Sequence, residues 1–323
     1  MKNFTQLTLE QRYQLEALLK MEPKLKQKEI ALQLGISEST VSREKRRHSK
    51  PRVGYRANDA QQQADKKRKR PAYKMTEEHI SIIRPLLEED LSPEQIVGRL
   101  KFQDIECVCH ETIYQYIYHQ QKKGDNLYVH LRRKRKKRRK RLKKVDNRGK
   151  IPNKTMIDQR PAEVELKQQI GHWEGDTIIG ANHQGAILTL VERVSKYTLV
   201  VALEAKTAQQ VEEKIVVALQ KIQLPVYTIT FDNGREFTNH QAIAQQLSIQ
   251  VFFAHPYHSW ERGLNENTNG LIRQYIPKKQ DFKELSKDHI ENIQNKLNNR
   301  PRKTLNFLSP IEFIQNQKIA FQY

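Results

Sequence analysis

Apolar positions near the N-terminus recur at helical spacing in three short segments. Residues 7–20 carry leucines at i, i+3 and i+4 behind a capping box formed by Thr8 and Gln11. Two further amphipathic segments cover 26–35 and 37–47. The predicted inner face of these two consists of Ile30, Ala31, Leu34, Ile36 and Val41. The pattern therefore predicts three helices packed around a small apolar core.

The turn between the second and third of these segments contains Gly35, which permits a tight reversal. Small residues and a short turn between two helices are typical of a helix-turn-helix unit. Its outer face would carry side chains suited to base edges and phosphates, namely Ser39, Thr40, Ser42, Arg43 and Arg46. We therefore predict a DNA-binding domain over residues 1–58; the alternative is a plain three-helix bundle.

The middle of the chain is predicted to alternate linkers with a second helical module. Residues 59–74 are polar and basic, which favours a linker. Within 75–122, "LSPEQIVGRL" has a capping box with proline at its first helical position, and "CHETIYQYIY" is amphipathic. This module is a second helix-turn-helix or a helical spacer. Residues 123–162 form a strongly basic linker, since every position from 132 to 144 except Leu142 is Lys or Arg.

The second half of the chain changes to strands alternating with helices. Three strand patterns come first, and a helix, a strand, a helix, a strand and two helices follow. The segments in that order are 172–180, 186–194, 197–204, 207–222, 226–232, 240–248, 249–254, 265–276 and 287–298. This is the element order of a ribonuclease-H-like fold. The predicted fold class is therefore multidomain, with an all-α helix-turn-helix region followed by an α/β ribonuclease-H-like (integrase-type) core over 163–323.

Three acidic residues fall where that topology would gather them at one edge of the sheet. Asp176 lies on the first strand, Asp232 ends the fourth, and Glu266 lies early in the following helix. Carboxylates that face one another are unfavourable without cations, and hard oxygen ligands suit Mg²⁺ or Mn²⁺. A pair of such ions supports phosphodiester displacement. Alternatively, Asp232 caps a turn in "DNG", and the other acidic candidates for the site are Glu174, Glu236 and Glu261.

The charge balance sharpens this picture, because the excess of basic residues is concentrated in the first half. Lys+Arg 58 minus Asp+Glu 37 gives +21 for the chain. Residues 1–150 hold 38 basic and 19 acidic side chains, and the remainder hold 20 and 18, so the halves carry +19 and +2. The first half is predicted to bind a polyanion. "CVCH" at 107–110 lacks a second pair of zinc ligands, which favours ordinary helix-start residues over a zinc site.

Several motifs together resemble bacterial insertion-sequence transposases of the IS-thirty family. They are "GHWEGDTIIG", "FDNGREF" and "PYHSWERGLNENTNGLIRQY", in this order, with 33 residues between Asp232 and Glu266. The resemblance extends along nearly the whole chain, including the helix-turn-helix, the basic run and the closing "NNRPRKTLNFLSPIEF". It implies a DDE transposase that binds terminal inverted repeats, cleaves a strand with a divalent metal and transfers the exposed 3′-hydroxyl to another phosphodiester.

By this resemblance Asp176, Asp232 and Glu266 are the catalytic metal ligands, with Mg²⁺ or Mn²⁺, two ions, as the cofactor. Arg273 would contact DNA near the site, and Tyr257, His258 and Trp260 would stack on or position DNA ends. For Trp260 the alternative is packing of the loop, and for His258 it is a hydrogen bond to the loop backbone.

The partners expected are element ends, target DNA and further copies of the chain in a synaptic complex. The expected location is the bacterial cytoplasm, associated with the nucleoid and not with a membrane, since no apolar run is long enough to span a bilayer. Two alternatives to an active transposase remain. One is a sequence-specific DNA-binding regulator with an inert core, and the other is a structure-selective nuclease.

Overall fold

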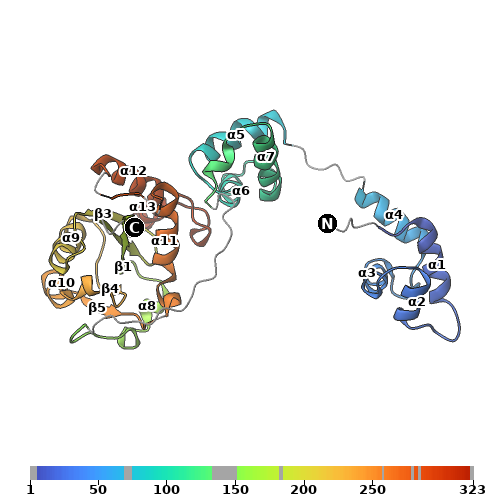
Figure 1. The fold of residues 1–323 in the computed structure, drawn as a ribbon, viewed down its shortest axis with the longest axis horizontal. Coiled ribbons are helices and arrows are strands. Elements are labelled where there is room, and N and C mark those ends of the chain that lie inside the picture. Colours follow the sequence, from blue (N-terminus) through green and yellow to red (C-terminus); the bar gives the residue numbers. More distant parts are fainter. Residues whose placement is uncertain are drawn as a thin grey trace. The chain divides into compact units, whose positions relative to one another are not determined.

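A computed structural model of the chain describes residues 6–68, 75–132, 151–181, 185–256, 258–277, 280–282 and 285–320. The fold divides into two compact units, Met1–Lys74 and Met75–Tyr323. Figure 1 shows helices alone in the first unit, and in the second a helical module together with a mixed α/β core. The predicted fold class, helices followed by an integrase-type α/β core, is confirmed.

The described residues of the N-terminal unit form four helices: α1 (Leu9–Leu19), α2 (Gln27–Gln33), α3 (Glu38–His48) and α4 (Ala57–Arg68). The first three lie where the apolar periodicity predicts them, and Gly35 adopts a left-handed φ of 62° in the turn between α2 and α3. The linker predicted for 59–74 is wrong for its first ten residues, which belong to α4. Ala60 and Ala64 are buried, so this polar, basic segment is a helix whose buried face contains small alanine side chains. Residues 69–74 lie outside the described residues.

A buried ion pair holds this helical unit together. Arg12 of α1 donates from Nε to Glu44 Oε1 of α3 at 2.8 Å, and Tyr55 Oη donates to the same oxygen at 3.2 Å. Arg12 also reaches the carbonyl of Leu7 and the side chain of Gln61 on α4. The predicted inner face is confirmed, with Ile30, Ala31, Leu34 and Val41 buried and Ile36 partly buried. The unit therefore combines a small apolar core with a satisfied charged pair.

The second helical module consists of α5 (Glu77–Glu88), α6 (Pro93–Phe102), α7 (His110–Lys122) and the 3₁₀ turn η1 (Leu127–His130). Leu127 of η1 is buried in the same apolar cluster as the helices. The boundary predicted at 122 is therefore too early, and residues up to 131 belong to the module. Cys109 is the N-cap of α7, which confirms the helix-start interpretation of "CVCH". Residues 133–150, with most of the basic run, lie outside the described residues.

The core is built on one five-stranded sheet in the order β3-β2-β1-β4-β5. Its strands are β1 (His172–Ile179), β2 (Ala186–Glu192), β3 (Thr198–Leu203), β4 (Thr228–Phe231) and β5 (Gln250–Phe253). The first three form an antiparallel meander, and β4 and β5 extend the sheet parallel to β1. The strand and helix order agrees with the prediction from the sequence.

Helices cover both faces of this sheet (Figure 1). On one face, α9 (Ala208–Lys221) and α10 (His240–Leu247) pack against Trp173, Leu188 and Phe231. On the other, α11 (Gly263–Tyr275) and α12 (Lys287–Asn298) pack against Ile178, Ile187 and Val200. The remaining described elements of the core are η2 (Ile157–Gln159), α8 (Glu163–Leu166), η4 (Arg235–Phe237), η5 (Ser259–Arg262), η6 (Lys303–Leu305) and α13 (Pro310–Ala320).

The core begins earlier than the predicted residue 163. Ile151 is buried in the cluster that contains Trp173 and Phe231, and Met156 forms a bridge to Phe253 of β5. Residues 151–162 were assigned to the basic linker because they follow a run of Lys and Arg. Their few apolar side chains instead reach the sheet, so the linker boundary predicted at 162 is wrong.

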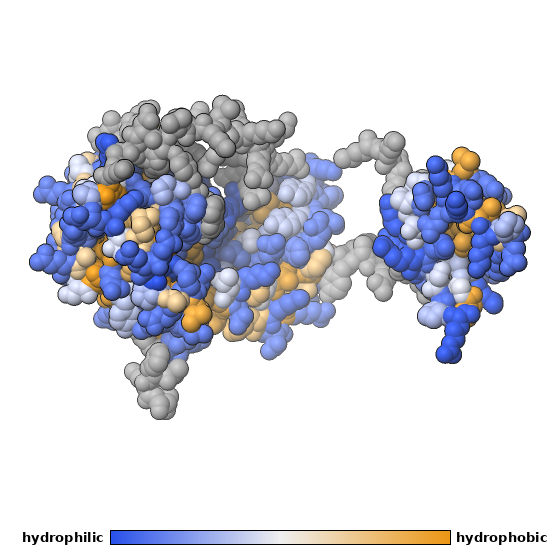
Figure 2. All heavy atoms as spheres, turned by 90° about the horizontal axis from the view of Figure 1, so that it is seen from below, coloured by the Kyte–Doolittle hydropathy of each residue, from blue (hydrophilic) through white to orange (hydrophobic). Residues whose placement is uncertain are grey.

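The surface view in Figure 2 shows apolar residues in small patches among hydrophilic ones. Among the residues that the structure describes, no helix is long and apolar enough to cross a membrane.

Candidate active site

Two predicted acids lie close together on neighbouring parallel strands, Asp176 within β1 and Asp232 just after the end of β4. β1 pairs with β4 through His172 with Thr228, Trp173 with Ile229, and Glu174 with Thr230, a constant offset of 56 residues. Continuing that offset two residues further sets Asp176 beside Asp232. Because side chains alternate along a strand and adjacent strands lie about 4.8 Å apart, the two carboxylates emerge close together on the same face. The register of one strand pair thus assembles the first part of the site.

Glycines flank both aspartates, for different reasons. A Cβ at Gly175 would lie 2.4 Å from the Phe231 ring, so this glycine lets the end of β4 pack against β1. A Cβ at Gly234 would lie 2.4 Å from a carboxylate oxygen of Glu236. The Glu236 carboxylate therefore fills the space beside Gly234.

Each aspartate is oriented by hydrogen bonds and turns one oxygen toward Arg262. Asp176 accepts from the backbone of Thr177 at 2.8 Å and from Asn269 Nδ2 at 2.7 Å. Asp232 Oδ1 accepts from the Gly234 backbone at 3.0 Å, so the turn-capping alternative also holds. Arg262 places Nη1 3.8 Å from Asp176 Oδ2 and Nη2 3.6 Å from Asp232 Oδ2. One guanidinium therefore lies between two carboxylates.

The electrostatics of Asp176 match this crowded position. Burial raises the pKa of Asp176 to about 6. The positive charge of Arg262 opposes this shift, and the negative charge of Asp232 adds to it. A carboxylate held in this way gains from a nearby positive charge, since its anionic form is poorly solvated.

Glu266 lies on the face of α11 that packs over β1. Arg262, at the N-cap of the helix, donates to the Gly175 carbonyl at 3.1 Å, Asn269 binds Asp176, and Arg273 donates to the Ile179 carbonyl at 2.8 Å. These three residues contact β1 one after another along the helix. Glu266 follows Arg262 by four residues and precedes Asn269 by three, a spacing that places it on the same face of α11. Its side chain is exposed. Among the described residues, no hydrogen bond or ion pair joins Glu266 to either aspartate.

The three competing acids have structural partners. Glu174 is buried, accepts from the Asn265 backbone at 3.4 Å and lies 3.4 Å from Arg193 Nε. Burial raises its pKa and Arg193 opposes the shift. Glu236 accepts from Thr177 Oγ1 at 2.7 Å and pairs with Lys206 at 2.6 Å. Glu174 and Glu236 therefore support the strand ends that carry the aspartates.

Glu261 organises the loop before α11. Its carboxylate accepts from the His255 backbone at 2.8 Å and lies 3.0 Å from the Nδ1 atoms of His255 and His258. These contacts lower the pKa of Glu261 although its partial burial opposes the change. The His258 side chain thus binds the Glu261 side chain of its own loop. The alternative, a hydrogen bond from His258 to the loop backbone, stays a prediction. Tyr257 and the side chain of Trp260 lie outside the described residues.

The predicted DNA-contacting residues divide into two groups. On α3, Ser39, Ser42, Arg43 and Arg46 are exposed and Thr40 is half-buried, so the predicted face is open to solvent. Arg273 is different, because its guanidinium binds the Ile179 carbonyl and lies 5.2 Å from the Phe282 ring centroid. The structure gives Arg273 a role in fixing the end of β1, and its contact with DNA stays a prediction.

Two residues of the site were missed from the sequence. Arg262 and Asn269 contact the aspartates directly, and both fall at helical spacing from Glu266. Their helical spacing from Glu266 was the signal in the sequence that could have identified them. However, an Arg and an Asn in "ERGLNENTNG" are equally suited to surface positions, and only the sheet register shows that they face acids.

The donor set fits a hard divalent cation. Two carboxylate oxygens, Asp176 Oδ2 and Asp232 Oδ2, face the same positive group, the guanidinium of Arg262. Carboxylate oxygens are the ligands that Mg²⁺ prefers. In the described part of the chain, the one group of three closely spaced His, Cys or acidic ligand atoms is His255, His258 and Glu261. That group forms the loop network described above.

Comparison with known proteins defines the class first. Residues 167–259 match the family model described as an integrase core domain. The catalytic core of BIV integrase is a structural neighbour with a TM-score of 0.36 and 21% identity, covering 46% of this chain and 97% of that one.

Curated relatives then define the family. The transposase for insertion sequence element IS4351 of Bacteroides fragilis is 45% identical over 98% of both chains. The transposase for IS1086 of Cupriavidus metallidurans is 38% identical over 88% of this chain and 87% of its own. The transposase InsI for IS30A of Escherichia coli is 35% identical over 96% and 83%. The chain belongs to the insertion-sequence transposases of the IS30 (IS-thirty) family.

Proposed function

We propose that this chain is an active DDE transposase that cleaves and joins DNA strands in a metal-dependent reaction. The observation that carries this proposal is that Asp176 of β1 and Asp232, just after β4, both face the guanidinium of Arg262, at the start of the helix α11 that carries Glu266. Its membership in a transposase family and its integrase core domain support the same chemistry. The three acids would hold two Mg²⁺ or Mn²⁺ ions.

The chain's own groups prepare the acids for this task. The backbone N–H groups of Thr177 and Gly234 hold the Oδ1 atoms of Asp176 and Asp232, so that both Oδ2 atoms face Arg262. Asn269 also donates to Asp176 Oδ2. Arg262 supplies a compensating positive charge to the two aspartates, and it would have to leave this position for a metal ion to bind between them. The bound metal would polarise the attacking oxygen and stabilise the leaving oxygen of the phosphodiester.

DNA recognition is assigned to the helical parts. The exposed α3 face, with Ser39, Ser42, Arg43 and Arg46, would contact base edges and phosphates of the terminal inverted repeats. The second helical module and the basic run at 132–144 would add phosphate contacts, which makes binding strongly salt-dependent. His258 and Trp260 would help to position the DNA end at the core. The protein would act in the cytoplasm on element ends and target DNA, as an oligomer that brings two ends together.

A joining assay tests this function. Labelled DNA that carries the ends of the chain's own element is incubated with the protein and Mg²⁺, and in parallel with a chelator. We expect cleaved and joined products with Mg²⁺ and unreacted, bound DNA with the chelator. Tight, specific binding without cleavage in Mg²⁺ or Mn²⁺ would instead establish a DNA-binding regulator with an inert core. Cleavage without joining would indicate a nuclease.

A further inference from the structure

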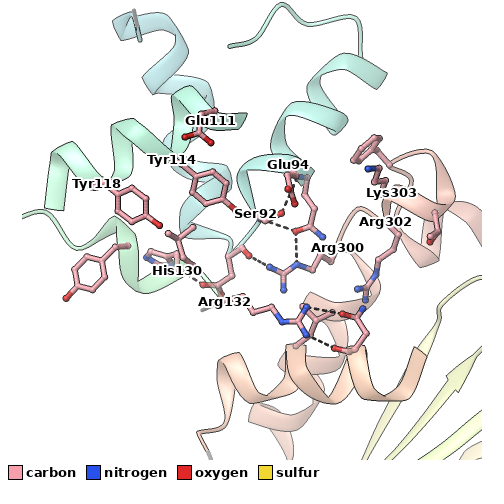
Figure 3. Close-up of a pocket in the computed structure, with 18 of the residues that line it drawn as sticks. Ser92, Glu94, Glu111, Tyr114, Tyr118, His130, Arg132, Arg300, Arg302 and Lys303 are labelled. Carbon is pink, nitrogen blue, oxygen red and sulfur yellow. Dashed lines mark hydrogen bonds and ion pairs between the residues drawn. The ribbon is translucent and has the colours of Figure 1, made fainter. Parts of the chain in front are cut away.

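A deep cleft separates the helical module from the C-terminal part of the core. It has a volume of about 1030 Å³ and is lined by α6, α7 and η1 on one side and by α11 and the η6 segment on the other. Figure 3 shows side chains from both sides pointing into it. None of the catalytic acids lines it, so the cleft is distinct from the site described above.

Specific contacts hold the two walls together. Arg99 of α6 pairs with Glu312 of α13, with Nη1 2.9 Å from Oε2. Gln95 donates to the Pro301 carbonyl at 2.8 Å, and the Phe307 ring fills the hollow at Gly98, where a Cβ would lie 2.0 Å away. Lys296 of α12 reaches Asp90 at 3.1 Å. The cleft is therefore a built feature of this unit, with a defined width.

The wall formed by the core is rich in positive charge. Arg300 is buried and donates to neutral oxygens, including Gln95 Oε1 at 3.1 Å and the Asp90 carbonyl. Arg302 donates to the Leu297 carbonyl at 3.0 Å, and its buried Nε has no partner among the described residues. The Asp90 carboxylate is already engaged by His130 and Lys296.

The arginines are close enough to affect one another. The pKa of Arg302 is lowered to about 10, chiefly by burial, and the positive charges of Arg300 and Arg132 contribute to this shift while Tyr275 opposes it. Lys303, which is exposed, and Arg132 also line the cleft. Clustered cations that lower one another's pKa are stabilised by an anion. The acids Glu94 and Glu111 lie in the first turns of α6 and α7 and line the opposite wall. The wall formed by the core therefore keeps its excess of positive charge.

The wall formed by the helical module presents aromatic rings. Tyr114 and Tyr118 are one turn apart on α7, with ring centroids 6.4 Å apart and planes inclined by only 18°. Figure 3 shows both rings projecting from α7 toward the side that carries Arg300 and Arg132. Flat rings beside a positive groove are the usual means of binding unpaired nucleic acid strands, because every base has a face for stacking and every phosphate a charge.

We propose that this cleft holds an unpaired segment of a DNA strand, with bases against Tyr114 and Tyr118 and phosphates near Arg132, Arg300 and Lys303. This inference rests on the proposed function, in which strands are cleaved and exchanged. A duplex fits these observations less well, because the faces of its paired bases are covered by neighbouring base pairs and cannot stack on the tyrosine rings.

Crosslinking tests the assignment without any transposition chemistry. The full-length protein is irradiated in EDTA with a single-stranded oligothymidylate of about 12 nucleotides that contains 5-bromouracil, and the crosslinked peptides are identified by mass spectrometry. We expect the α7 peptide with Tyr114 and Tyr118 to be labelled. Crosslinks confined to the basic run or to α3 would overturn the proposal. No metal ion or element end is present, so the crosslinking result does not depend on transposase activity. The cleft assignment and the proposed function can therefore fail independently of each other.

Matched variants measure the contribution of each wall. In a titration with the same oligonucleotide, the double variant Tyr114→Ala/Tyr118→Ala should bind about tenfold more weakly, and Tyr114→Phe/Tyr118→Phe should bind like the wild type. Lys303→Glu should weaken binding several-fold and reduce its salt dependence, whereas Lys287→Glu, on the exposed start of α12, should not. Equal affinities for the Ala, Phe and wild-type proteins, or equal effects of the two lysine variants, would refute the cleft as the binding site.

Discussion

The N-terminal unit and the catalytic core treat buried charge in opposite ways. In the N-terminal unit, Arg12 and Glu44 form a close pair at 2.8 Å, and Tyr55 completes the network. In the core, Asp176 and Asp232 lie side by side, and the guanidinium nitrogens of Arg262 stay at 3.8 and 3.6 Å. The pair in the N-terminal unit is in close contact, whereas the two aspartates that we propose as metal ligands are compensated only at a longer distance. This contrast can be tested by removing charge from each region.

The largest effect is expected from Asp232→Asn in the core. Loss of one carboxylate charge should reduce strand cleavage and joining by about 10⁴-fold or more, because the acids act as one unit. Binding to element ends should persist, since the helical parts are unchanged. The assays are end cleavage, strand joining and a gel-shift titration, with the exposed acid variant Glu213→Gln as the active control.

The same variant also tests the comparison through stability. Removing a like charge beside Asp176 should leave the thermal midpoint of unfolding unchanged or raise it. A clear loss of stability in Asp232→Asn, or loss of end binding, would show that this acid is structural in the way that Glu44 is.

A smaller effect, on stability, is expected from Arg12→Met in the N-terminal unit. This change leaves Glu44 buried without its cation and should cost about 3 to 5 kcal/mol in the free energy of unfolding of that unit. Hydrogen exchange of the α1 and α3 amides in the full chain measures it. Arg12→Met/Glu44→Gln removes the orphaned charge and should recover part of the loss. If the double variant is less stable than the single one, the pair is not what holds these helices.

Gly175→Ala should destabilise the core by about 1 to 3 kcal/mol through overpacking against Phe231. Denaturant unfolding of the full chain measures the change. Gly263→Ala is the control, because a Cβ there meets nothing within 4 Å, and it should shift stability by less than about 1 kcal/mol. Similar behaviour of the two variants would mean that β1 and β4 can separate at the acid pair without penalty.

The smallest effect concerns the loop held by Glu261. The hydrogen bond to Glu261 raises the pKa of His255, and Asp158 adds to the shift. The stabilisation that protonated His255 gives is therefore fully present below its pKa in the unfolded chain, about 6.5. It is lost as the pH rises through the higher pKa of His255 in the folded state. His255→Gln should increase hydrogen exchange of residues 254–262 about twofold relative to wild type at pH 6 and have no effect at pH 9. An equal effect at both pH values would assign the loop's order to packing alone.

Much of this architecture could be predicted from the sequence, because local patterns carry it. Helical periodicity and capping residues placed α1 to α3, and alternating strand and helix segments gave the order of the core. The basic segment at 59–68 was misassigned because its two buried alanines are too few to show a periodic apolar face. Residues 123–131 and 151–162 were assigned to a linker for a similar reason, since only contacts with distant residues bury them.

The candidate site shows the same division. Asp176 on a strand, Asp232 at a strand end and Glu266 early in a helix were predicted from the sequence as metal ligands, and a family resemblance implies the same role. Arg262 and Asn269 were not, because their importance depends on which strand α11 covers. The sequence by itself determined the elements, the charge asymmetry and the acids. Only the tertiary structure decided the 56-residue register that pairs the aspartates, the guanidinium between them and the cleft beside α7. These features arise from contacts between residues far apart in the chain, which local periodicity does not encode.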